Sequence, residues 1–123
     1  MKTAIAVLAV VLLAGCAAPK APPGLVSDVQ AWRAKTMQEN TAVLDATLNE
    51  QGDSLTVTVD GYAWDALQPQ TKRELANYCG YTLKSLRLKN GLPKDSFCSA
   101  YILDKTGTRL ARASTASGVE ITR

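Results

Sequence analysis

The sequence predicts one α/β domain of the α+β type, a two-layer sandwich with two helices on a mostly antiparallel sheet of about four strands. Two observations predict this fold class. Apolar and polar residues alternate in two pairs of short runs, and each pair encloses a turn, which is typical of half-buried hairpins. Before each pair, apolar residues recur at helical spacing. The expected order is therefore helix, hairpin, helix, hairpin, in a single globular domain over residues 25–123.

The first helix is expected to run from Ser27 to about Gln38. Ser27 is a suitable N-cap residue because its hydroxyl can accept a hydrogen bond from a backbone N–H of the first turn. The apolar side chains that fall on one face of this helix are Leu25, Val29 and Trp32.

A β-hairpin is expected over residues 44–59. The sequence Glu-Gln-Gly-Asp at 50–53 is typical of a turn, and apolar residues alternate with polar ones on both sides of it. One face of the hairpin should therefore be buried. Its apolar residues are Leu44, Ala46, Leu48, Leu55, Val57 and Val59.

Residues 71–91 form the most strongly predicted helix. Asn90 and Gly91 are typical of a helix end, and Pro93 prevents continuation. Gly80 costs a helix about 1 kcal/mol relative to alanine, so it indicates a close approach to the sheet or a bend. The apolar stripe of this helix is Leu75, Cys79, Leu83 and Leu86.

The second hairpin is expected at residues 100–104 and 108–113, joined by the turn Lys105–Thr106–Gly107. Residues 119–122 could add a further strand after Gly118.

Residues 1–16, MKTAIAVLAVVLLAGC, have the pattern of an export signal. A positive Lys2 precedes the apolar run Ala4–Ala14, which is too short to span a bilayer but suits a signal peptide. Leu13-Ala14-Gly15-Cys16 resembles the lipobox of bacterial lipoproteins. That resemblance implies cleavage after residue 15 and lipidation of Cys16 by acyl chains such as palmitate, which anchor the protein in a membrane. An ordinary secretory signal with an incidental cysteine is the alternative.

The resemblance also implies an address. In the sorting rule of enteric bacteria, Ala17 after the lipidated cysteine favours the periplasmic face of the outer membrane over the inner membrane. Residues 16–24 then form a Pro-rich tether of extended, polyproline-like chain before the domain.

Cys79 and Cys98 are the two cysteines that remain once Cys16 carries lipid. An exported protein enters an oxidising compartment, where disulfides persist, so we expect a Cys79–Cys98 disulfide. Two buried thiols are the alternative. No metal site and no cofactor are expected, because the chain has no histidine and the cysteine spacing matches no zinc motif.

Catalysis is not expected. The sequence contains no phosphate-binding loop and no nucleophile motif, and the lack of histidine removes the commonest general base. Asp60 and Asp65 could form a carboxylate pair beside aromatic residues, as in glycosidases, but acidic residues at strand ends are common. A formal net charge of +3 is too small to indicate nucleic-acid binding.

Two surfaces are candidates for binding a partner. Tyr62 and Trp64, at a spacing of two in an expected loop, could face the same way and anchor a protein or glycan, or Trp64 could belong to the core. The basic side of the second helix could contact anionic groups or remain solvated. Its candidate residues are Lys84, Arg87 and Lys89.

These features together indicate a non-catalytic lipoprotein that binds another component of the bacterial envelope, a protein or the cell wall. A phage or plasmid exclusion lipoprotein, or an inhibitor of a cell-wall hydrolase, is the alternative. The sequence leaves the oligomeric state open.

Overall fold

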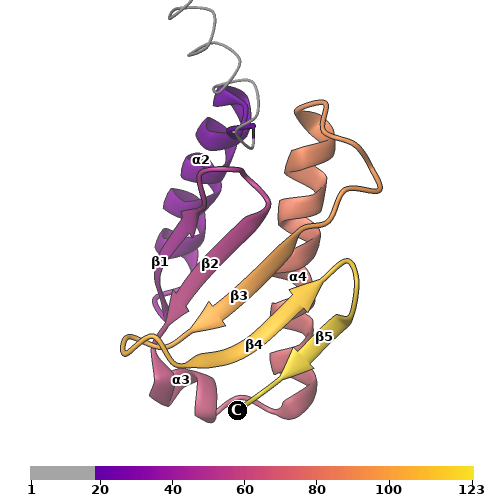
Figure 1. Ribbon diagram of the computed structural model, residues 1–123. Coiled ribbons are helices and arrows are strands. Elements are labelled where there is room, and N and C mark those ends of the chain that lie inside the picture. The colour runs from indigo at the N-terminus through magenta and orange to yellow at the C-terminus, as the bar shows by residue number, and fades with distance from the viewer. Residues whose placement is uncertain (1–18) are drawn as a thin grey trace, which may run out of the picture.

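The computed structural model describes residues 19–123, so the expected signal peptide and Cys16 lie outside the described residues. These residues form a five-stranded sheet with both long helices on one face (Figure 1), which confirms the predicted two-layer α+β fold. A short helix between β2 and α4 is added to the predicted elements, and the further strand suggested at residues 119–122 is present as β5. The elements are α2 (Pro23–Glu39), β1 (Val43–Leu48), β2 (Ser54–Val59), α3 (Gly61–Asp65), α4 (Pro69–Lys89), β3 (Ser99–Leu103), β4 (Arg109–Ser114) and β5 (Gly118–Ile121).

Helix α2 begins at Pro23, four residues before the predicted N-cap Ser27. Pro22 is the N-cap residue instead. Proline suits the first turn of a helix because its φ is already helical and its missing N–H would have no partner there. The backbone N–H of Ala21 also donates to the carbonyl of Glu50, 2.8 Å away, so the domain begins at about Ala21 rather than Leu25.

The strands follow the order β1-β2-β3-β4-β5, and every neighbouring pair is antiparallel except β2 and β3. Both predicted hairpins are confirmed. Strand β1 departs from strict alternation because a bulge lies between Val43 and Asp45. Leu44, predicted to be buried, is therefore exposed, and Val43 takes the buried position with Ala46.

The core lies between the helices and one face of the sheet. Leu25, Leu55, Leu83 and Leu110 are its largest fully buried aliphatic residues, and they come from α2, β2, α4 and β4. Within residues 19–123, the buried core residues lie between Leu25 and Ala113 and come mainly from both long helices, α3 and the sheet.

Gly80 lies where α4 passes closest to the sheet. A Cβ atom added at Gly80 would lie 2.8 Å from the Cβ of Ala113 in β4, closer than two such atoms can pack. The close approach predicted from the sequence is thus present, and α4 uses a glycine because no larger residue fits.

The domain has two distinct ends (Figure 1). The start of α2, the β1–β2 turn and the end of α4 lie together at one end, which we call the N-terminal end. There the Lys89 ammonium of α4 pairs with the carboxylate of Asp28 in α2 at 3.4 Å. Helix α3, the β3–β4 turn and the residues after β5 lie at the opposite end, which we call the α3 end.

The Gly80–Ala113 contact gives a direct test of this packing. Gly80→Ala should lower the free energy of unfolding by about 1 kcal/mol, because overpacking costs about 1–3 kcal/mol and outweighs the helix propensity gained. Adding Ala113→Gly makes room, so the double variant should lose less than the sum of the single losses. Urea unfolding gives the free energy of unfolding of all three variants. A stabilising effect of Gly80→Ala alone would contradict the close contact.

Candidate functional site

Helix α3 carries Tyr62 and Trp64, the two aromatic residues that the sequence suggested as a contact surface. The carboxylate of Asp60 caps the helix, accepting hydrogen bonds from the backbone N–H groups of Tyr62 at 2.9 Å and Ala63 at 3.3 Å. Because this segment is helical rather than extended, two residues at a spacing of two point to different sides. Tyr62 is 89% exposed, whereas Trp64 is 2% exposed. The alternative in which Trp64 belongs to the core is therefore confirmed, and Tyr62 and Trp64 do not form one exposed surface.

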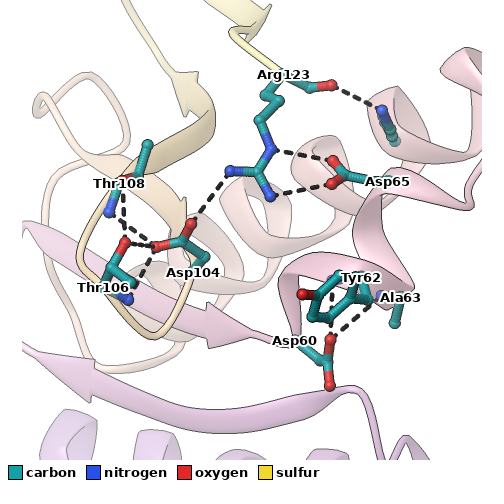
Figure 2. A network of polar contacts seen from close by, with 9 residues as sticks. Asp60, Tyr62, Ala63, Asp65, Asp104, Thr106, Thr108 and Arg123 are labelled. Carbon is teal, nitrogen blue, oxygen red and sulfur yellow. Dashed lines mark hydrogen bonds and ion pairs between the residues drawn. The ribbon is translucent and has the colours of Figure 1, made fainter.

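An ion-pair network holds α3 to the rest of the α3 end (Figure 2). The Arg123 guanidinium donates from Nε and Nη2 to the two carboxylate oxygens of Asp65, at 3.0 and 3.1 Å. Its third nitrogen, Nη1, donates to Asp104 at 3.2 Å. One side chain thereby joins the residues after β5 to α3 and to the β3–β4 turn.

Asp104 organises the β3–β4 turn. One carboxylate oxygen accepts hydrogen bonds from the Thr106 hydroxyl and from the backbone N–H groups of Thr106 and Thr108 (Figure 2). The hydroxyl of Thr106 first, and then the backbone donors and Arg123, hold the pKa of Asp104 below its usual value. Asp104 therefore remains ionised at neutral pH.

Lys72 joins the start of α4 to the same network. Its Nζ donates to the backbone carbonyl of Arg123 at 2.7 Å and lies 5.7 Å from the centre of the Trp64 ring. This is a cation–π arrangement. Lys72 thus connects the buried aromatic residue of α3 to the residues after β5.

The resulting surface is a shallow depression of about 300 Å³. Asp60 and Asp65 do not form a catalytic pair there, because Asp60 caps α3 and Asp65 is paired with Arg123. What the depression offers is the exposed ring of Tyr62 beside a fixed, charged rim. Its lining residues are Gly61, Tyr62, Asp65, Asp104, Lys105, Thr106 and Arg123.

The basic candidates on α4 do not form one free surface. Arg87 is buried, and its guanidinium donates to the carbonyl of Gly52 and to the Ser96 hydroxyl. Lys89 is paired with Asp28, and Lys84 is partly buried. The interpretation of Arg87 as a surface contact is wrong, because its partners come from the β1–β2 turn and the loop after α4, which the sequence of one helix does not reveal.

The predicted disulfide between Cys79 and Cys98 is wrong, since both thiols are free and buried. The two cysteines line different depressions: Cys98 lines one with Gly80 and Lys84, and Cys79 lines another with Val57 and Leu75. Burial raises the pKa of Cys79 to about 12, so its thiol stays neutral.

Within residues 19–123, no three Cys, Asp or Glu side chains come together as metal ligands. None of the helices described is both long and apolar enough to cross a membrane. No protein-family model, curated protein or solved structure matches the chain significantly.

The burial of both cysteines predicts their reactivity. In the folded chain of residues 17–123, a thiol reagent such as Ellman's reagent should modify neither Cys79 nor Cys98 within minutes, because the reactive thiolate is suppressed and covered. In denaturant both should react. The final absorbance of the chromophore that the reagent releases gives the number of thiols that have reacted. A domain with no free thiol after unfolding would contradict the structure.

Proposed function

We propose that this protein is a lipid-anchored, non-catalytic protein of the bacterial envelope, which binds an envelope partner through the α3 end. The observation that carries the proposal is the sequence of residues 1–16, a positive start, a short apolar run and the lipobox-like Leu-Ala-Gly-Cys. Cys16 is the lipidated residue, and Ala17 after it favours the periplasmic face of the outer membrane. Two or more acyl chains on one cysteine suffice for stable anchoring.

The short connection between Cys16 and the domain supports an orientation in which the α3 end faces away from the membrane. Ala21 is already hydrogen-bonded to Glu50, so the Cα atoms of Cys16 and Ala21 are separated by at most about 18 Å of extended chain. Helix α2, with 17 residues, is itself about 25 Å long. A tether shorter than the domain keeps the N-terminal end near the membrane and directs the α3 end away from it.

Tyr62 is the residue best suited to contact a partner there. It is the most exposed of the large hydrophobic residues described, and tyrosine is enriched among residues that dominate binding energy. The network of Arg123, Asp65 and Asp104 holds the surrounding backbone, so little flexibility is lost when a partner binds. A rigid surface with a projecting aromatic side chain fits a protein partner.

Lipidation of Cys16 is tested by metabolic labelling with a palmitate analogue in a Gram-negative host. The natural chain should be labelled and processed, and Cys16→Ser should remain an unlabelled precursor, because only the thiol of Cys16 can form the thioether. Cys98→Ser serves as the matched control and should be labelled normally. Unchanged labelling of Cys16→Ser would refute the anchor.

The orientation is tested by photocrosslinking in the native envelope. A photoreactive amino acid at position 62 should give a discrete protein adduct, while the same group at Phe97, in the loop after α4, should give lipid adducts or none. Tyr62→Ala should reduce recovery of the partner at least tenfold with no loss of stability, and Tyr81→Ala is the exposed control. Identical adducts from positions 62 and 97 would contradict the proposal, and a cell-wall hydrolase as the adduct would favour the inhibitor hypothesis.

A further inference from the structure

An apolar cavity lies between the two long helices, on the helix side of β2. Helix α2 packs mainly on β1, and α4 packs mainly on β3, β4 and β5, so the buried face of β2 lies where the two helices diverge. The inner chamber has a volume of about 120 Å³. Its aliphatic walls are Val43, Val57, Val59, Leu67, Leu75 and Ile102.

The inner chamber adjoins an outer one of about 190 Å³, with which it shares Asn40, Val43, Val57, Leu75 and Cys79. Trp32 of α2 and Tyr78 of α4 line the outer chamber, with their ring centres 6.3 Å apart. The Trp32 Nε1–H donates to the Tyr78 hydroxyl at 3.4 Å, and Tyr78 is half exposed. This weak aromatic contact joins α2 and α4 at the side of the cavity nearest to solvent.

Trp64 forms a wall of the inner chamber and carries a donor without a partner. Its side chain is 2% exposed, and its indole Nε1–H has no hydrogen-bond acceptor among residues 19–123. Buried polar groups in proteins are nearly always paired, so an unpaired donor needs an explanation. The other side chains that line the inner chamber are aliphatic, apart from the Cys79 thiol and the Asn40 side chain, whose oxygen already accepts from the N–H of Ala42. The Lys72 ammonium, 5.7 Å from the centre of the Trp64 ring, is a donor and cannot accept from the indole.

We propose that this cavity binds a small, neutral, apolar molecule that carries one hydrogen-bond acceptor for Trp64 Nε1. An apolar cavity of about 150 Å³ accommodates benzene, and the inner chamber of about 120 Å³ adjoins the outer one of about 190 Å³, so together they have room for a six-membered ring or a short acyl group. No charged residue lines the inner chamber, so an ionised ligand would lose its hydration without compensation. A carbonyl, ester or amide oxygen supplies the missing acceptor. This site is independent of the anchor and of the surface at Tyr62.

The two tryptophans make the proposal measurable. In the chain of residues 17–123, which includes every core residue described, NMR should show two indole N–H signals, and Trp32→Phe assigns them. Cyclohexanone and cyclohexane serve as probes of similar shape, of which only the ketone has an acceptor. We expect saturable shifts of the Trp64 signal with both probes and a downfield change of its N–H proton with cyclohexanone alone. Shifts confined to Trp32, or none with either probe, would overturn the proposal.

Two variants separate binding from general destabilisation. Trp64→Phe keeps an aromatic wall but removes the donor, so it should weaken cyclohexanone binding about tenfold and leave cyclohexane binding unchanged, as followed by the shift of the Ile102 methyl groups. Ala63→Leu fills the inner chamber, so it should raise Tm and abolish binding of both probes. Equal losses for the two probes in Trp64→Phe, or unchanged binding in Ala63→Leu, would overturn the proposal.

Discussion

The parallel pairing of β2 with β3 determines where α3 and α4 must lie. Two parallel neighbours require a connection that returns along the whole length of the sheet, and here α3 and α4 provide it. Helix α4 therefore lies on the same face as α2, and this single helical layer buries the core. The return begins with α3, which places Tyr62 outside and Trp64 inside at one end of the domain.

The same topology separates the two ends of the molecule. The N-terminal end joins α2, the β1–β2 turn and the end of α4, with Arg87 buried as a structural donor to the turn. The α3 end is joined by Arg123 and its two carboxylates. A lipid on Cys16 would lie close to the first end, so the proposed contact surface and the apolar cavity beside Trp64 lie away from the membrane.

The fold could be predicted from the sequence because its signals are local. Alternation revealed both hairpins, and Gly80 indicated the close contact that Ala113 makes with α4. The site could be predicted only in part, because its contacts join distant residues. Nothing in the local pattern shows that Arg123 reaches Asp65 or that Arg87 is buried. The Asp60 cap was the one available signal that residues 61–65 are helical and that Tyr62 and Trp64 diverge.

In the proposed orientation, a short tether holds the domain with its α3 end away from the membrane. Resonance energy transfer between the domain and the bilayer tests this orientation. A donor dye is attached to a cysteine introduced at Tyr62 or at Lys94, and the bilayer that holds the lipidated chain contains acceptor lipids. Cys79 and Cys98 are buried, so they should not take the dye. With the α3 end directed away from the bilayer, transfer should be strong from position 94 and much weaker from position 62. Equal transfer from both positions would refute this orientation.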